Sequence, residues 1–207
     1  MRPAVALTLL LTSCAKPTAP APAIDPRLAA SVPVDASAVA GFRPSEVPGL
    51  AASFGDARYV LVSMRGTEVS TAVLAADGSV SGPGTKGGVS PLLAEGKALA
   101  AKHPAWAVIR GGAPLPLKGN LANVNNLLMD AELITAGTQQ GDPFLVELTA
   151  TCPSEERAQR LEGSLRAVIL LLKGEGSLVR REGRVVKGWL RVPACVINPA
   201  SCGSASH

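Results

Sequence analysis

The chain has 207 residues and a formal net charge of +4 at neutral pH, and hydrophobic residues make up 47% of it. This length fits one ordinary domain, and the apolar content is sufficient for a real core. Aromatic residues make up only 3%, so Val, Leu and Ala must fill that core. The modest basic excess lies after residue 156, where basic residues and glutamates are interleaved, and such a pattern is typical of solvated faces rather than of nucleic-acid binding.

The first fourteen residues have the organisation of an export signal. Arg2 supplies a positive charge, and an apolar run extends from Pro3 to Leu11. A run of about ten apolar residues is too short to span a bilayer as a helix, which needs about twenty. It has the length of a signal-peptide core. The segment closes with Leu11-Thr12-Ser13-Cys14.

A branched apolar residue, two small residues and a Cys resemble the lipobox of bacterial lipoproteins. The resemblance implies cleavage before Cys14 and acylation of its thiol and new amino group, for example with palmitate, on a mature chain of about 194 residues (207 less 13). Each buried methylene contributes about 0.8 kcal/mol, so two or more acyl chains hold stably. Ala15 and Lys16 follow without an adjacent Asp, which resembles sorting to the outer membrane. We therefore expect a lipid-anchored envelope protein that faces the periplasm.

An ordinary secretory signal is the alternative interpretation of this segment. Ala21-Pro22-Ala23 would then be the small-residue cleavage site, and the product would be a soluble secreted protein. That site lies about ten residues beyond the apolar core, and Pro-rich sequence surrounds it. The lipobox is the interpretation that the spacing favours.

Composition and pattern divide the chain into five predicted parts. Seven prolines between residues 15 and 48 exclude a long helix and favour a semi-extended tether. The parts are a signal peptide (1–13), the lipidated Cys with a Pro/Ala-rich tether (14–48), a subregion with a β-hairpin and a helix (49–104), a ferredoxin-like unit (105–193) and a Cys-containing tail (194–207).

The subregion 49–104 carries a hairpin signal and a helix signal. Residues 57–64 and 68–75 have the composition of strands, and Arg65-Gly66 predicts the turn between them. Ser90-Pro91 predicts a helix start, because Ser is a favoured cap and Pro is favoured at the first helical position. We expect this helix to end near His103.

From residue 105 onward the pattern alternates between strand and helix. Its order is strand, helix, strand, strand, helix, strand, which is that of a ferredoxin-like split βαβ unit. We therefore predict an α+β fold with helices on one face of an antiparallel sheet, which the preceding hairpin and helix either extend or accompany as a small lobe. The predicted strands are 105–110, 131–136, 144–151 and 184–192, and the predicted helices are 120–128 and 153–173.

Three cysteines remain besides Cys14. Cys195 and Cys202 are separated by a short turn-forming loop, and exported chains reach compartments where disulfides persist. We expect a disulfide between them that stabilises the fold by about 2–3 kcal/mol. Cys152 is expected to be a small buried hydrophobe, with pairing to either tail Cys left open. The spacing does not fit a zinc site, so we expect no metal and no cofactor.

Residues of catalytic type do not form a recognisable constellation. His103 is expected to act as a cation near a helix C-terminus, and Glu155-Glu156 to suit a helix N-terminus. Cys152 precedes a helix, which can lower a thiol pKa, but it has no evident resolving partner. The sequence therefore favours a non-enzymatic protein, with an envelope hydrolase that lacks a recognisable motif as the alternative.

The strand 184–192 carries the candidate binding face. Alternation places Lys187, Trp189 and Arg191 on the side opposite Val186 and Leu190. An aromatic ring between cations can stack and bind anions, although the same pattern fits a face covered by the N-terminal lobe, with the cations reaching outward. Export argues against nucleic acid. We therefore expect a membrane-anchored module that binds or scaffolds an envelope protein or an anionic polymer.

Overall fold

The computed structural model describes residues 24–47, 50–83, 89–113, 125, 128–139, 144–171 and 176–192. Within these residues the chain forms one α+β unit built on an open nine-stranded sheet. The predicted α+β class is confirmed, although the sheet is larger than a ferredoxin-like unit. The strands are β1 (Ala38–Phe42), β2 (Tyr59–Arg65), β3 (Glu68–Leu74), β4 (Val80–Ser81), β5 (Ala105–Arg110), β6 (Leu133–Gln139), β7 (Phe144–Thr151), β8 (Leu178–Glu182) and β9 (Val185–Val192). The helices are α1 (Pro26–Ala29), the 3-10 helix η1 (Pro44–Glu46), α2 (Ala51–Phe54), α3 (Leu92–Ala100) and α5 (Glu155–Leu171).

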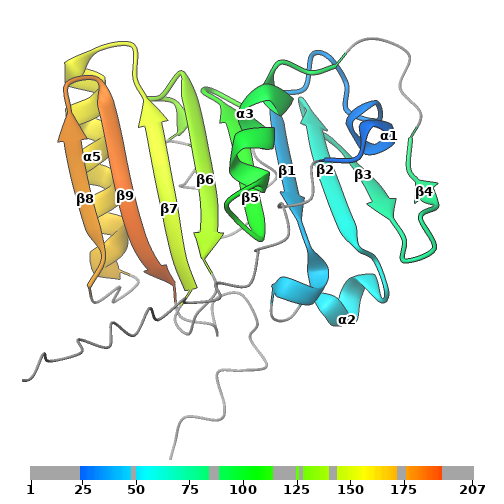
Figure 1. Ribbon diagram of the computed structural model, residues 1–207. Helices are drawn as coiled ribbons and strands as arrows, with labels where there is room; N and C mark the ends of the chain where they lie inside the picture. The colour runs from blue at the N-terminus through cyan, green and yellow to red at the C-terminus, as the bar shows by residue number, and fades with distance from the viewer. Residues whose placement is uncertain are drawn as a thin grey trace, which may run out of the picture.

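Every pair of neighbouring strands in this sheet is antiparallel. The order across the sheet is β4-β3-β2-β1-β5-β6-β7-β9-β8 (Figure 1). The strands on one side of β5 come from the first half of the chain, and those on the other side come from the second half. The hairpin of the N-terminal subregion therefore extends the main sheet.

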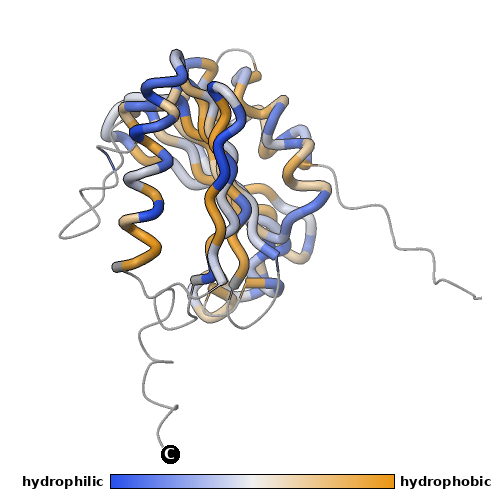
Figure 2. The backbone as a smooth tube through the Cα atoms, turned by 90° about the vertical axis from the view of Figure 1, so that its left-hand side faces the viewer, coloured by the Kyte–Doolittle hydropathy of each residue, from blue (hydrophilic) through white to orange (hydrophobic). Residues whose placement is uncertain are grey.

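The two longest described helices lie on opposite faces of the sheet. Helix α3 packs against β1, β5 and β6, whereas α5 packs against β8 and β9. Figure 2 shows one helix on each side of the sheet. We call the two surfaces the α3 face and the α5 face. The prediction that helices cover one face is wrong for α3 and α5, because the two halves of the sheet bury opposite faces.

The core under the α3 face is centred on Trp106. Its indole Nε1 donates a hydrogen bond of 2.6 Å to the hydroxyl of Tyr59, so both buried polar atoms have a partner. Two glycines make room for the ring: a Cβ at Gly41 would lie 2.7 Å from it and one at Gly96 only 2.4 Å. The aliphatic residues that complete this core are Ile24, Leu28, Val32, Val39, Leu61, Leu92, Leu93 and Val108.

The core under the α5 face is smaller and mainly aliphatic. Strand residues Ile134, Ala150 and Val186 lie side by side in register, and all are buried. Ile109 of β5 packs against this core, whereas its neighbour Val108 belongs to the core on the other face. The members contributed by α5 are Ala158, Leu161 and Leu165. Because successive side chains of a strand point to opposite faces, the central strands contribute residues to two cores, one on each side of the sheet.

The predicted ferredoxin-like topology is not confirmed. A split βαβ unit has a third strand between two parallel strands. Instead β5 and β6 are direct antiparallel neighbours, with Trp106 opposite Gly137 and Arg110 opposite Leu133. Strand β1 occupies the other side of β5, and β8 extends the sheet beyond β9. The order of elements was predicted well, but pairing between distant segments decided the topology.

The predicted tether over residues 14–48 is wrong for residues 24–47. This segment forms α1, η1 and β1, and β1 lies between β2 and β5 in the interior of the sheet. Its prolines occupy tolerated positions, since Pro26 is in the first turn of α1 and Pro44 begins η1. Apolar side chains such as Leu28 and Val39 are buried and hold the segment in place. Residues 14–23 lie outside the described residues.

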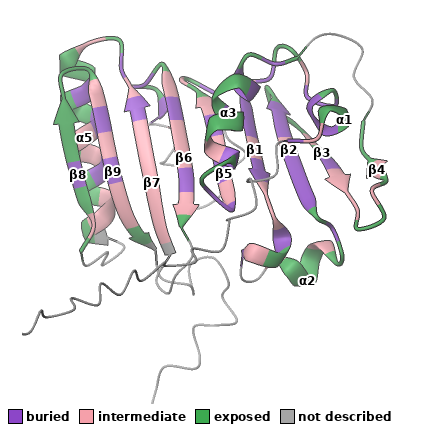
Figure 3. Ribbon diagram, in the orientation of Figure 1, coloured by how far each residue is buried: buried purple, intermediate pink, exposed green. Residues whose placement is uncertain are grey.

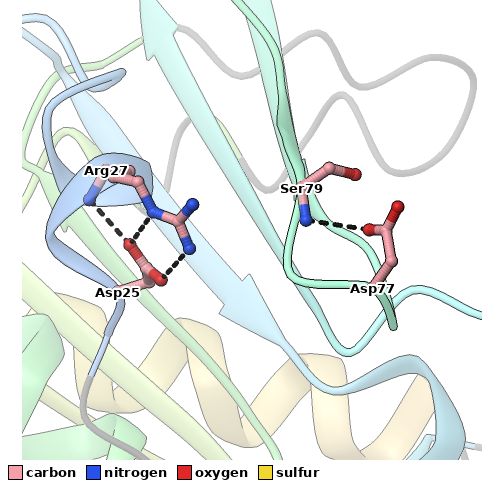
Figure 4. A network of polar contacts seen from close by, with 4 residues as sticks. All are labelled: Asp25, Arg27, Asp77 and Ser79. Atoms are coloured by element: carbon pink, nitrogen blue, oxygen red, sulfur yellow. Dashed lines mark hydrogen bonds and ion pairs between the residues drawn. The ribbon is translucent and has the colours of Figure 1, made fainter.

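Local hydrogen bonds explain where α1 and the turn after β3 begin. Asp25 caps α1 by accepting a 2.8 Å bond from the backbone N–H of Arg27, and the two side chains form an ion pair of 2.9 Å. Asp77 accepts a 2.8 Å bond from the backbone N–H of Ser79, and Gly78 between them has a φ of 82° (Figure 4). The predicted turn at Gly66 is confirmed, since this residue also has a positive φ, of 60°.

The remaining predicted elements agree closely with the structure. Strands 105–110 and 144–151 have the predicted bounds, and the other predicted strands differ by at most three residues at an end. Helix α3 starts at Leu92 with Pro91 as its cap, so the predicted cap role of Ser90 is wrong. The predicted helix 120–128 falls mostly outside the described residues. Strands β1, β4 and β8 were not predicted.

Candidate functional site

The described helices leave the α3 face of three strands, β7, β9 and β8, without a helix. Helix α3 covers β1, β5 and part of β6, and α1 contacts β3. Figure 1 shows α3 in front of the sheet's centre, whereas α5 lies behind β8 and β9. No helix of the described residues packs on the α3 face of β7, β9 and β8.

Register places the three candidate residues of β9 in the middle of this open region. Trp189 lies directly between Leu178 of β8 and Glu147 of β7. The next row along the strands holds Lys187. We call the whole set the open patch: Leu145, Glu147, Thr149, Leu178, Arg180, Glu182, Lys187, Trp189 and Arg191.

Burial confirms which side of β9 faces the core. Val186 is fully buried, and Leu190 packs against the core under α5. Trp189 is half-buried and Arg191 is exposed. Figure 3 shows β9 as a strand of mostly buried and intermediate segments, next to the largely exposed β8. Leu178, opposite Trp189 in the register, is 52% exposed.

The open patch carries charges of both signs with a small cationic excess. Three cations (Arg180, Lys187 and Arg191) accompany two carboxylates, which leaves a net charge of +1. Lys187 Nζ lies 2.7 Å from Glu182 Oε2, and this hydrogen bond, with the charge of Lys187, lowers the pKa of Glu182. The side chains of Arg180 and Arg191 are exposed at the two ends of the cationic stretch.

Glu147 connects the open patch to a buried histidine. Its Oε1 accepts a 2.5 Å hydrogen bond from Gln139 Nε2, and its Oε2 lies 3.9 Å from His103 Nε2. His103 is only 6% exposed, and its Nδ1 lies 3.2 Å from the carbonyl oxygen of Thr138. The His103 ring packs directly against the backbone of Gly137, where a Cβ would lie only 2.3 Å from the ring.

His103 lies just after helix α3, as predicted, but its environment differs from the expected one. The sequence suggested a cation near the helix dipole, and the structure instead packs the ring between the end of α3 and β6. The one signal for this contact is Gly137 in the middle of a strand, which often marks a close approach. The residue that would approach it was not predictable without the register.

The described residues contain one free cysteine, Cys152, and it is fully buried. Burial raises the pKa of its thiol, and the nearby carboxylates of Asp130 and Glu132 raise it further. The prediction of a small buried hydrophobe is confirmed, and the environment opposes a reactive thiolate. Cys14, Cys195 and Cys202 lie outside the described residues, so the anchor and the tail disulfide remain predictions.

Concave surfaces elsewhere do not assemble catalytic groups. A polar hollow of about 250 Å³ is bordered by Asp25, Arg43, Glu46 and Tyr59. Three of its charged side chains are in ion pairs: Arg43 Nε lies 2.7 Å from Glu46 Oε1, and Asp25 binds Arg27. In the part of the chain that the structure describes, no three His, Cys, Asp or Glu side chains are grouped as a metal site would need.

The comparisons with known proteins add no functional assignment. Searches against models of protein families, curated proteins and solved structures found no match. None of the helices in the described ranges combines the length and apolar character needed to cross a bilayer. The open patch is therefore the feature from which function has to be inferred.

The sequence did not predict the part of the open patch on β8, nor the position of Glu147 beside Trp189. Leu178 and Arg180 lie on β8, which has three charged residues in a row and so lacks the usual strand composition. A signal was present, because Gly183-Arg184 separates β8 from β9 by two residues, and two-residue loops with Gly are typical of hairpins. Glu147 was placed on a predicted strand, but its position beside Trp189 depends on the pairing of β7 with β9.

Proposed function

We propose that this chain is a bacterial cell-envelope lipoprotein, anchored through acylated Cys14, whose folded part binds an envelope partner through the open patch and is not an enzyme. The observation that carries the binding role is the α3 face of β7, β9 and β8, on which no helix of the described residues packs. An outer-membrane location facing the periplasm belongs to the same proposal and is supported by Ala15-Lys16 after the lipobox resemblance.

The composition of the open patch supports recognition of a protein. Trp and Arg are enriched at the centres of protein interfaces, where they contribute most of the binding free energy. Trp189 and Leu178 supply exposed apolar area, and Arg180 and Arg191 flank it. Paired strands hold these side chains rigidly, which lowers the entropic cost of binding. Carboxylates at Glu147 and Glu182 favour a partner of mixed charge over a uniform polyanion.

The folded N-terminal segment limits how far such a module could stand from the lipid. Ile24 is buried in the core, so ten residue steps join it to Cys14. At about 3.3–3.6 Å per residue, the connection spans at most roughly 35 Å. A long spacer was expected from the prolines, whereas this length keeps the domain close to the membrane surface.

Replacement of Cys14 tests the anchor. We expect Cys14→Ser to abolish acylation and to move the protein out of the membrane fraction, because the thiol that carries the lipid is lost. Ser13→Ala is the matched control, since it keeps a small residue before the Cys and should remain membrane-bound. Intact mass of the purified protein and fractionation of cells measure both. Unchanged mass and membrane association in Cys14→Ser would refute the lipoprotein proposal.

Site-specific photocrosslinking in intact cell envelopes tests the binding role. A photoreactive residue at Leu178 lies in the open patch, and one at Leu170 is the control because that side chain is 79% exposed on α5. We expect a discrete adduct from position 178 that Arg191→Glu weakens, and none of that size from position 170. Equal adducts from both positions, or no effect of Arg191→Glu, would contradict binding through the open patch.

A further inference from the structure

The hydrogen-bond geometry around His103 depends on its protonation. The nearest partner of Nδ1 is the carbonyl oxygen of Thr138, which can only accept, so Nδ1 carries a proton. In a neutral imidazole Nε2 is then an acceptor, yet it faces Glu147 Oε2, which is also an acceptor when ionised. Only the imidazolium can donate to both groups. The present separation of 3.9 Å is too long for a hydrogen bond.

Among the described residues, the other charged side chains near His103 include Arg43 and Lys102, and both are cations. Arg43, beyond the end of β1, donates a 3.3 Å bond to the carbonyl of Ala100 and pairs with Glu46. Lys102 precedes His103 and is exposed. From β6 the neutral Gln139 donates to Glu147. Glu147 of β7 is therefore the carboxylate toward which a protonated Nε2 points.

Glu147 is also the residue directly opposite Trp189 in the register of β7 and β9. A change at His103 can thus reach the open patch through one side chain. We infer that His103 is a pH-responsive positioning residue: its protonation draws Glu147 into an ion pair and makes the open patch more cationic beside Trp189. One proton moves from solvent to Nε2, and the patch's net charge rises from +1 to +2 once Glu147 is neutralised by pairing.

The higher net charge of the open patch would change its affinity for an acidic partner. An acidic group would approach Trp189 more readily when His103 is protonated, because the uncompensated carboxylate beside the ring is gone. Histidine is the side chain that most commonly serves as a pH-dependent switch in proteins, and protonation is the change that would bring about this effect. This consequence for binding rests on the proposed function, whereas the coupling of His103 to Trp189 is a property of the chain alone.

Nuclear magnetic resonance titration of the full chain measures the coupling without a partner. The chain has two tryptophans and two histidines, so the indole N–H and ring signals of Trp189 and His103 can be assigned with Trp189→Phe and His103→Gln. We expect the Trp189 indole signal to shift between pH 5 and 8 with the same midpoint as the His103 ring. In Glu147→Gln the Trp189 shift should be lost while the His103 ring still titrates.

Glu182→Gln is the matched control, because it removes the other carboxylate of the open patch without touching His103. The Trp189 shift should persist in this variant. The inference is overturned if Trp189 does not follow His103, if Trp189 still titrates in Glu147→Gln, or if the His103 ring stays neutral until the fold is lost. None of these results depends on lipidation of Cys14 or on finding a partner, so they are distinct from failure of the proposed function.

Discussion

At the scale of single residues, Cys152 links burial to a measurable pH dependence. Its thiol is fully buried, and burial raises its pKa above the ordinary value of about 8.5 that it has in the unfolded chain. Between the unfolded and the folded pKa, the unfolded chain has lost a proton that the folded chain retains. A rise in pH through this range therefore favours unfolding.

We expect the free energy of unfolding to fall as pH rises above about 8.5, and to fall less steeply in Cys152→Ala. Urea denaturation of both chains under reducing conditions, at pH 7 and at several values up to 10, gives the two slopes. Buried Tyr59 also has a raised pKa and acts in the same direction, but it is common to both chains and cancels in the comparison. Identical slopes would contradict the burial argument.

At the scale of elements, replacement by Ala of the two glycines in the middle of helices α5 and α3 should change stability in opposite directions. Gly to Ala ordinarily stabilises a helix by about 0.5–1 kcal/mol. In α5 a Cβ at Gly163 would meet nothing within 4 Å, so Gly163→Ala should give this gain. In α3 a Cβ at Gly96 would lie 2.4 Å from the Trp106 ring, so Gly96→Ala forces the helix or the ring to move.

We therefore expect Gly163→Ala to raise stability and Gly96→Ala to lower it by about 1–3 kcal/mol, the usual cost of overpacking. Denaturant unfolding measures both changes. Near-ultraviolet circular dichroism should change only in Gly96→Ala, since Trp106 is displaced there. A gain of stability in both variants would mean that α3 does not pack on Trp106 as described.

Element composition also explains which strands the sequence could predict. Strand β2 is rich in β-branched and aromatic residues and was located within two residues. Strand β1 reads Ala38-Val39-Ala40-Gly41-Phe42, and its small residues were taken for part of a tether. Gly41 is there because the Trp106 ring and the Tyr59 hydroxyl occupy the space of a Cβ. That reason is tertiary, so local propensity could not reveal it.

The candidate site was predictable to the extent that it lies on one strand. Alternation along β9 sufficed to put Trp189 on the face away from Val186. Leu178, Glu147 and His103 come from three other elements, and strand pairing brings the first two beside Trp189. Pairing of segments distant in sequence is not encoded in local composition, which is why the topology and six of the nine residues of the open patch had to come from the structure.

At the scale of the whole molecule, β1 joins the two halves of the sheet. It is hydrogen-bonded to β2 on one side and to β5 on the other, five residues to each. Without it, β2 and β5 would both become unpaired edges, and the α3 core would lose Val39 along with Leu28 of the preceding helix. The segment that resembled a tether is thus a structural centre.

Truncation separates these two interpretations. A chain that begins at Ala15 keeps every described residue, and we expect it to unfold cooperatively. A chain that begins at Gly49, where the sequence alone would place the folded part, should lose cooperative unfolding and tend to aggregate, because its exposed strand edges can pair between molecules. Thermal unfolding followed by circular dichroism, with sedimentation to detect aggregates, compares the two. If the shorter chain stays monomeric and unfolds at the same temperature, residues 24–47 contribute no stability, and β1 cannot be the strand that holds the halves together.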